Sequence, residues 1–134
     1  MRVGFVGAGF MGQVAHIRNY VGLSGCEIVA LAERRRLLRE QVAGRYDIPR
    51  TYESHEQLAA DEDVEGVVAV LPHALNDQVA CDLLEAGKHV LTEKPMASSL
   101  AAASRMVEAA DAAGKRLMIG YMKPEKRKLG ISVT

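Results

Sequence analysis

The sequence lacks a charge imbalance, a long hydrophobic run and a leader segment. Its 134 residues carry 17 basic and 17 acidic side chains, so the formal net charge at pH 7 is zero. Without a net field, electrostatic attraction to nucleic acid or to an anionic membrane is not expected. No apolar run reaches the roughly 20 residues that a membrane-spanning helix needs. No charged-then-apolar leader precedes the first apolar segment. We therefore expect a cytoplasmic protein with neither nucleic acid nor membrane among its partners.

Cysteine and histidine are too sparse and too scattered to indicate a metal centre. The two cysteines, Cys26 and Cys81, have neither the spacing of a zinc site nor that of a redox pair. They are predicted to be reduced and mostly buried thiols. The four histidines show no HxxxH or HExxH spacing. The sequence therefore predicts no bound metal.

The most informative feature that is present is a glycine-rich turn. Residues 7–12 read Gly-Ala-Gly-Phe-Met-Gly and directly follow the apolar run Val3–Val6. Gly-x-Gly-x-x-Gly between a strand and a helix is typical of dinucleotide-binding βαβ units. Gly7 permits the tight turn, Gly9 lets the backbone approach a pyrophosphate, and Gly12 lets the helix pack on the sheet. The predicted phosphate-binding residues are Gly7, Gly9, Phe10, Met11 and Gly12. The alternative is a glycine-rich turn in an α/β protein that binds no nucleotide.

An acidic residue stands where such a unit needs one. Glu33 follows a second apolar run, Ile28–Ala32, about 20 residues after Gly12. A carboxylate there accepts hydrogen bonds from the adenosine ribose and repels a 2′-phosphate, which favours NAD. The three arginines at 34–36 favour NADP, because a guanidinium pairs with that phosphate. Arg34 alternatively lies over the adenine ring. We expect NAD as the cofactor, with NADP possible.

Strand and helix patterns alternate along the chain. The predicted strands are Arg2–Val6, Glu27–Ala32, Arg50–Tyr52, Gly66–Leu71, Lys88–Leu91 and Arg116–Gly120, and the predicted helices are Met11–Val21, Arg34–Arg45, Ser54–Ala60, Asn76–Glu85 and one from Ser98 or Ser99 to Gly114. The second helix is expected to bury Leu37, Leu38 and Val42. This alternation predicts a doubly wound parallel sheet, the Rossmann fold, with three layers and about six strands in the order 3-2-1-4-5-6. Ligand is then expected at the carboxyl ends of the strands.

The alternating pattern covers residues 1–120, which we expect to form one NAD(P)-binding domain. Residues 121–134 carry four basic side chains against one acidic one and are interrupted by Pro124 and Gly130. They are predicted to form a flexible basic tail without further strands.

A second motif ends the predicted fifth strand. Residues 86–95 read Ala-Gly-Lys-His-Val-Leu-Thr-Glu-Lys-Pro. Together with the glycine-rich turn and with Gly120-Tyr121, this stretch resembles the amino-terminal domain of the glucose–fructose oxidoreductase/inositol dehydrogenase (Gfo/Idh/MocA) family. The resemblance covers about residues 1–122. It implies NAD(P)-dependent hydride transfer between nicotinamide C4 and a carbon of a sugar, cyclitol or related alcohol.

The same resemblance implies roles for the end of that strand. Lys94 is implied to be the catalytic lysine, in contact with a substrate hydroxyl and with the nicotinamide region. An ammonium there favours alkoxide-like charge as the hydroxyl proton leaves. Glu93 is expected to orient this lysine and to lie beside the cofactor. The Lys94–Pro95 peptide bond is expected to be cis.

The turn after the predicted fourth strand is also expected to pass the cofactor. Leu71 and Pro72 are predicted to contact the dinucleotide, and His73 is predicted to be a loop residue rather than a catalyst. Asn76 stands where the family often has a histidine. It is predicted chiefly to cap the following helix, with a hydrogen bond to the cofactor as the alternative.

Relatives in this family have a second α/β domain, which supplies most of the substrate pocket and groups for proton transfer. That domain is expected to be absent here, because the residues after Met122 do not resemble the usual continuation. The chain is then either the cofactor-binding part of an oxidoreductase or a non-catalytic nucleotide-binding or interaction module. A truncated gene, a frameshifted product and a natural stand-alone domain all stay open. A homo-oligomer, or a partner chain that supplies a substrate domain, is expected to cover the apolar surface left exposed.

Overall fold

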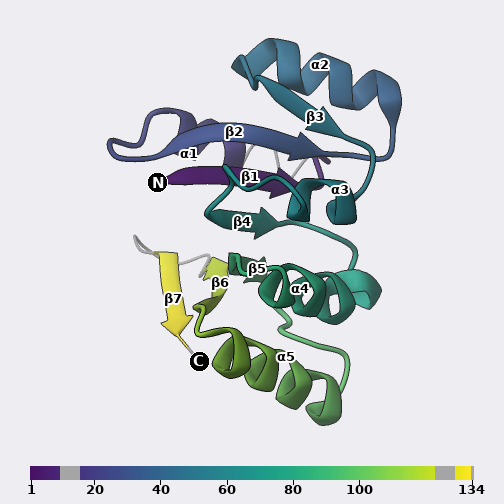
Figure 1. Ribbon diagram of the computed structural model, residues 1–134, viewed down its shortest axis with the longest axis vertical. Coiled ribbons are helices and arrows are strands. Elements are labelled where there is room, and N and C mark those ends of the chain that lie inside the picture. The colour runs from purple at the N-terminus through teal and green to yellow at the C-terminus, as the bar shows by residue number, and fades with distance from the viewer. Residues whose placement is uncertain (10–15, 123–128, 134) are drawn as a thin grey trace.

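Seven strands form one sheet at the centre of the protein (Figure 1). The computed structural model describes residues 1–9, 16–122 and 129–133. The strands are β1 (Arg2–Val6), β2 (Glu27–Ala32), β3 (Arg50–Tyr52), β4 (Gly66–Ala69), β5 (His89–Glu93), β6 (Leu117–Met122) and β7 (Leu129–Val133). Their order across the sheet is β3-β2-β1-β4-β5-β6-β7, and the first six are parallel. The predicted doubly wound fold and strand order are confirmed.

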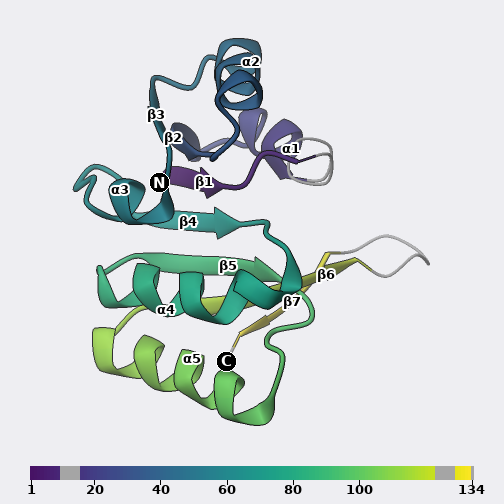
Figure 2. The same cartoon turned by 90° about the vertical axis from the view of Figure 1, so that its right-hand side faces the viewer.

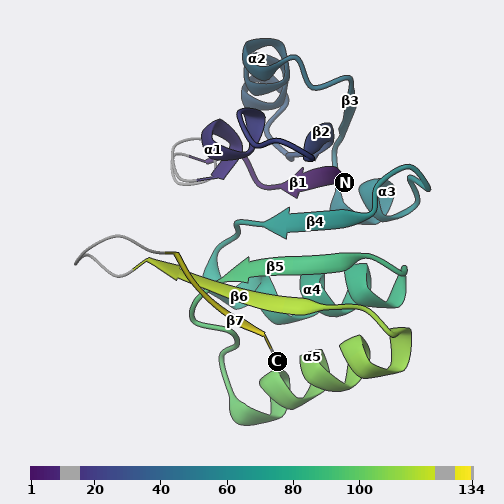
Figure 3. The same ribbon diagram turned by 90° about the vertical axis from the view of Figure 1, so that its left-hand side faces the viewer.

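Helices cover both faces of this sheet and produce three layers (Figures 2 and 3). They are α1 (Arg18–Val21), α2 (Arg36–Tyr46), α3 (His55–Ala59), the 3-10 turn η2 (His73–Leu75), α4 (Asn76–Glu85) and α5 (Leu100–Ala113). α1 and α2 lie on one face of the sheet, while α3, α4 and α5 lie on the other. No helix within the described ranges is both long enough and apolar enough to cross a membrane.

Each face of the sheet has its own apolar core. On one face Ile17 and Val42 pack with strand residues such as Phe5, and on the other Leu58 and Met106 pack with residues of β4, β5 and β6. All four residues of β4 are buried, as a central parallel strand requires. β1 and β4, the strands on either side of the site described below, contribute residues to both cores.

The prediction that Leu37 of α2 is buried is wrong. Leu37 is 75% exposed, whereas Val42 is fully buried and Leu38 is partly buried. Residues four apart share a helix face, and a neighbour one position away is rotated by about 100° from it. The buried stripe of α2 therefore runs through Leu38 and Val42, and Leu37 points away from the sheet.

The segment after residue 120 also differs from the prediction. Leu129–Val133 form β7, which pairs antiparallel with β6 and sets Leu129 opposite Met122. The alternating sequence Leu-Gly-Ile-Ser-Val suits a strand. An edge such as that of β6 offers a row of unpaired backbone groups to such a segment. The sheet thus gains a seventh strand where an irregular tail was expected.

The ends of two helices agree with the predicted caps. Ser54 Oγ accepts the N–H of Gln57 at 3.3 Å, and Ser99 Oγ accepts the N–H of Ala102 at 3.1 Å. Asn76, in contrast, does not cap α4 as predicted. The residue that precedes α4 is Leu75, and no side chain caps that end. The predicted helix Met11–Val21 is described only from residue 16 onward.

Candidate functional site

A cleft lies at the carboxyl ends of β1, β2 and β4. Its volume is about 1200 Å³, which is ample for an extended ligand. The strand order reverses direction between β1 and β4, and ligands of doubly wound sheets bind at such a switch point. Six of the predicted site residues line the cleft: Gly7, Gly9, Glu33, Arg34, Leu71 and Pro72. The cleft therefore lies where the sequence pattern predicts a ligand.

Gly7 is a glycine for reasons internal to the fold. Its φ is +92°, and a Cβ added there would lie 2.2 Å from the carbonyl oxygen of Val70. Its N–H donates to the carbonyl of Ala32 at 2.9 Å, which ties the turn to the end of β2. No larger residue fits between these strands without moving backbone, so Gly7 sets the tight turn out of β1.

Gly9 is different, because nothing in the described protein requires a glycine there. Its φ lies outside the left-handed region, and an added Cβ would approach only a guanidinium nitrogen of Arg35, at 3.9 Å. Ordinary van der Waals contact of this kind would tolerate alanine. The space beside the Gly9 backbone opens into the cleft. A ligand that approaches the backbone closely would explain the glycine. Phe10, Met11 and Gly12 lie outside the described residues.

Glu33 lies at the end of β2 and is only 7% exposed. Its Oε2 accepts the N–H of Ala8 at 2.9 Å, and its Oε1 accepts the N–H and the Nε–H of Arg35 at 3.1 and 2.9 Å. Burial alone would raise the pKa of this carboxyl. Hydrogen bonds from Arg35 and Ala8 more than offset that effect, and the pKa lies below its ordinary value. Glu33 therefore presents a fixed negative charge to the cleft.

Two arginines surround this carboxylate with positive charge. Arg34 and Arg35 are exposed and line the same cleft. Arg39 donates from Nη1 to the carbonyl oxygen of Glu33 at 2.9 Å and so fixes the backbone at the end of β2. The structure thus brings Glu33 and two of the three competing arginines to one end of the cleft, whereas Arg36 pairs with Glu40 on α2.

The second predicted group lies at the end of β5. The Lys94–Pro95 peptide bond is cis, as predicted. The backbone N–H of Lys94 donates to the carbonyl oxygen of Gly120 on β6 at 3.1 Å, and the Lys94 side chain is exposed. The Glu93 carboxylate is an ion-pair partner of the His16 imidazole. The neighbouring strand β4 separates this group from the β1–β2 end of the cleft.

Asn76 and His16 both reach this strand end. Asn76 Nδ2 donates to the carbonyl oxygen of Glu93 at 3.2 Å and lies 3.5 Å from that of Pro95. His16 is a functional candidate that the sequence analysis missed. It shows no metal spacing, and its partner Glu93 is far away along the chain. Its only sequence signal is its place in the helical segment just after the glycine-rich turn.

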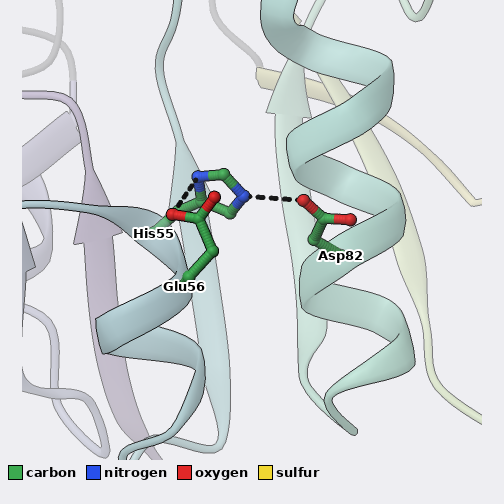
Figure 4. A group of neighbouring side chains, drawn as sticks. All are labelled: His55, Glu56 and Asp82. Atoms are coloured by element: carbon green, nitrogen blue, oxygen red, sulfur yellow. Dashed lines mark hydrogen bonds and ion pairs between the residues drawn. The ribbon is translucent and has the colours of Figure 1, made fainter.

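His55 stands at the rim of the cleft between two carboxylates (Figure 4). Its Nε2 lies 2.8 Å from Oδ2 of Asp82 on α4, and its Nδ1 lies 3.4 Å from Oε2 of Glu56 on α3. The three groups lie within 4.8 Å of one another. Each carboxylate, however, faces a different ring nitrogen, and a neutral imidazole offers one lone pair to a metal. This geometry fits a hydrogen-bonded bridge between α3 and α4 better than a metal cage.

Cys26 and Cys81 are free and only partly buried.

Several known proteins are similar to this chain in sequence and fold. The model of the GFO_IDH_MocA family, an oxidoreductase family with an NAD-binding Rossmann fold, matches residues 1–121. An inositol 2-dehydrogenase/D-chiro-inositol 3-dehydrogenase from Shouchella clausii is 36% identical over 126 residues, covering 92% of this chain and 36% of the relative. An uncharacterized oxidoreductase from Rhizobium meliloti is 34% identical over 122 residues, covering 91% of this chain and 36% of the relative. The chain therefore spans about a third of the length of these relatives.

Solved structures show the same partial overlap. KijD10, a 3-ketoreductase from Actinomadura kijaniata in complex with NADP and TDP-benzene, superposes with a TM-score of 0.85 at 28% identity, covering 89% of this chain and 36% of that one. The WlbA dehydrogenase from Bordetella pertussis, in complex with NADH and UDP-GlcNAcA, has a TM-score of 0.82 at 28% identity, covering 88% of this chain and 36% of that one. One of these structures holds NADP and the other holds NADH.

Proposed function

Because this chain belongs to the GFO_IDH_MocA oxidoreductase family and spans its NAD-binding Rossmann fold, we propose that it holds a nicotinamide cofactor for the oxidation of an alcohol or the reverse reduction. In the oxidation, the alcohol carbon loses a hydride to nicotinamide C4, and the hydroxyl loses a proton to a base. The proposed substrate is a sugar, a cyclitol or a related alcohol, and the inositol dehydrogenase among the relatives supports that class.

The observation that carries this proposal is the contrast between two glycines. Gly7 is required by the backbone of Val70, whereas Gly9 has no strained backbone angle and, among the residues that the structure describes, meets only Arg35 at 3.9 Å. A glycine that the described part of the chain does not need for its own packing fits a backbone that must approach a pyrophosphate. The residues present therefore fit a dinucleotide.

At the adenosine end, Glu33 is the proposed acceptor for a ribose hydroxyl. Both of its oxygens already accept hydrogen bonds, from Ala8 and from Arg35. Arg35 also donates from Nη2 to Oε2 at 3.3 Å, so all four lone pairs of the carboxylate are in use. A ribose hydroxyl is therefore proposed to replace the exposed Arg35 side chain on one of these oxygens. Arg34 and Arg35 offer donors to a 2′-phosphate in the same cleft. The proposed cofactor is NAD, with NADP also accepted.

At the nicotinamide end, Lys94 is the proposed catalytic residue. Its ammonium stabilises the negative charge that develops on the substrate oxygen as the proton leaves. The remaining proposed contacts to the cofactor come from Glu93, Leu71, Pro72 and Asn76. These residues follow β4 and β5, in the half of the sheet that takes the second mononucleotide of a bound dinucleotide.

A further segment, a second copy or a partner chain is proposed to complete the substrate pocket, because the chain spans about a third of its relatives' length. The alternative proposal is a nucleotide-binding module without catalysis. The proposed location is the cytoplasm, where reducing conditions suit the free thiols of Cys26 and Cys81.

Calorimetric titration with NADH, and then with NADPH, tests the proposal. The variant Gly9→Ala places one methyl group where the pyrophosphate is proposed to lie, and Gly44→Ala is the matched control. A Cβ at Gly44 on α2 meets nothing within 4 Å. We expect Gly9→Ala to weaken NADH binding by about tenfold or more, equivalent to about 1.4 kcal/mol, while its unfolding midpoint stays close to that of wild type.

Three results would change the conclusion. A folded wild-type chain that binds neither nucleotide contradicts the proposed function. A Gly9→Ala variant that binds NADH as tightly as wild type contradicts the role of that glycine. NADPH binding that is tighter than NADH binding reverses the assignment of Glu33 in favour of Arg34 and Arg35.

A further inference from the structure

We infer that His16 and Asn76 are positioning residues, which hold the turn of residues 93–95 from two sides and so set the place of Lys94 at the nicotinamide end. The inference rests on the proposed function. Neither residue is needed to explain the binding of the adenosine half. Both are buried polar side chains directed at the same strand end.

His16 holds the side chain of the turn. It is 4% exposed, and its Nε2 pairs with Oε1 of Glu93, whose side chain is 27% exposed. Burying an imidazole without a partner is unfavourable, so this contact has to be kept once His16 is buried. The pair connects the segment after the glycine-rich turn to the end of β5. The phosphate end and the lysine end of the site are thereby joined by one hydrogen bond.

Asn76 holds the backbone of the same turn. It is 3% exposed, and its Nδ2 donates to the carbonyl oxygen of Glu93 and lies near that of Pro95. Within the described residues, its Oδ1 has no hydrogen-bond partner. A buried acceptor in that state is unfavourable, and the side chain does not cap its own helix. Stability alone does not explain this asparagine, whereas a need to fix the turn does.

These contacts fix the backbone on both sides of Lys94. The carbonyl of Glu93 before it and, at 3.5 Å, that of Pro95 after it face the amide of Asn76, and its own N–H donates to Gly120 on β6. The exposed side chain of Lys94 therefore starts from a backbone position at the end of β5 that α4 and β6 both hold. A catalytic group held in this way needs less reorganisation to meet its substrate.

The test compares two ligands that differ in the nicotinamide. NADH carries both ends of the dinucleotide, whereas ADP-ribose lacks the nicotinamide ring. We expect His16→Ala and Asn76→Ala to weaken NADH binding about five- to tenfold and to change the fluorescence of the bound nicotinamide. Their affinity for ADP-ribose should stay within about twofold of wild type. His16→Gln keeps a donor that can face Glu93 and should recover most of the loss.

A double-mutant cycle separates positioning from general support. Because His16 is inferred to act through Lys94, the double variant His16→Ala/Lys94→Ala should bind NADH no more weakly than Lys94→Ala. His89→Ala is the matched control, since His89 lies at the opposite end of β5 and contacts Arg116. If His16→Ala does not fold, Glu93→Gln removes the negative charge of the same pair at its more exposed member.

The outcomes distinguish this inference from the proposed function. Wild-type binding of NADH with variants that behave like wild type overturns the positioning roles and leaves the proposed function intact. Equal losses for NADH and ADP-ribose, or additive losses in the double variant, also overturn them. A wild-type chain that binds neither ligand overturns the proposed function itself.

Discussion

Replacing Glu33 with glutamine preserves the size of the side chain and removes one acceptor oxygen. In the folded chain Oε1 accepts from the backbone and the Nε of Arg35, and Oε2 accepts from the N–H of Ala8 and from Nη2 of Arg35. An amide has one oxygen, so its NH₂ group must face one of these donors. A buried donor left without an acceptor costs about 1–3 kcal/mol. We expect Glu33→Gln to lower the free energy of unfolding by about 2 kcal/mol.

Urea unfolding followed by circular dichroism measures this loss, because the chain has no tryptophan to report by fluorescence. With a typical m-value, 2 kcal/mol moves the midpoint by about 1 M. Glu40→Gln is the matched control, since Glu40 is exposed and pairs with Arg36 four residues away at 3.1 Å. Glu40→Gln should lower the free energy of unfolding by less than about 0.5 kcal/mol. If Glu33→Gln shifts the midpoint no more than Glu40→Gln, the inferred need for both oxygens of Glu33 is wrong.

The pH dependence of the stability difference between wild type and Glu33→Gln provides a second check. The pKa of Glu33 is lower in the folded chain than its ordinary value, so the unfolded chain binds this proton first as the pH falls. The stability that Glu33 supplies is therefore complete above the ordinary pKa and is lost as the pH falls through the folded pKa. The gap between wild type and Glu33→Gln should be constant near neutral pH and should shrink below about pH 4. A gap that widens in acid contradicts this assignment.

Three further substitutions test other contacts by the same unfolding assay. Gly7→Ala should destabilise the chain by about 3 kcal/mol or more, because the methyl group meets the carbonyl of Val70 and the positive φ is strained; a loss below about 1 kcal/mol would show that the turn relaxes. Lys88→Met should cost about 2 kcal/mol, since the buried ammonium donates to two backbone carbonyls at 2.7 and 2.8 Å that would lose their donor; an unchanged midpoint would mean that water replaces it. Asp61→Asn should cost about 1–2 kcal/mol at neutral pH, because Asp61 accepts from Arg50 at 2.7 Å. Burial raises the pKa of Asp61, but the hydrogen bonds that it accepts have the larger, opposite effect, so the pKa lies below its ordinary value. The loss of stability caused by Asp61→Asn should therefore decrease in acid.

Much of the fold follows from local patterns in the sequence. The glycine-rich turn, the acidic residue after β2 and the buried run of β4 each depend on residues close together along the chain. Because such signals are local, they predict the strand order and the place of the cleft, and the structure confirms both. The motif that ends β5 likewise predicts the cis bond before Pro95.

The features that were missed depend on partners far apart along the chain. Asn76 was expected to cap its own helix, yet its amide donates to carbonyls of the β5 turn. His16 meets Glu93 only because the parallel strands β1 and β5 both end on the same side of the sheet. β7 depends on the free edge of β6, which no local pattern reveals. Packing between distant segments settles these contacts, and local propensity does not specify them.

The central position of β1 has a consequence for how the chain folds during synthesis. Val3 pairs with Ile28 on one side and with Gly66 on the other. The first partner leaves the ribosome soon after β1, but the second follows on the order of a few seconds later at ordinary translation rates. Pairing between distant segments is also intrinsically slower. The half-sheet of β1, β2 and β3 can therefore assemble while the other edge of β1 still waits for β4. The cleft at the junction of the two halves therefore takes its shape only once β4 has paired with β1.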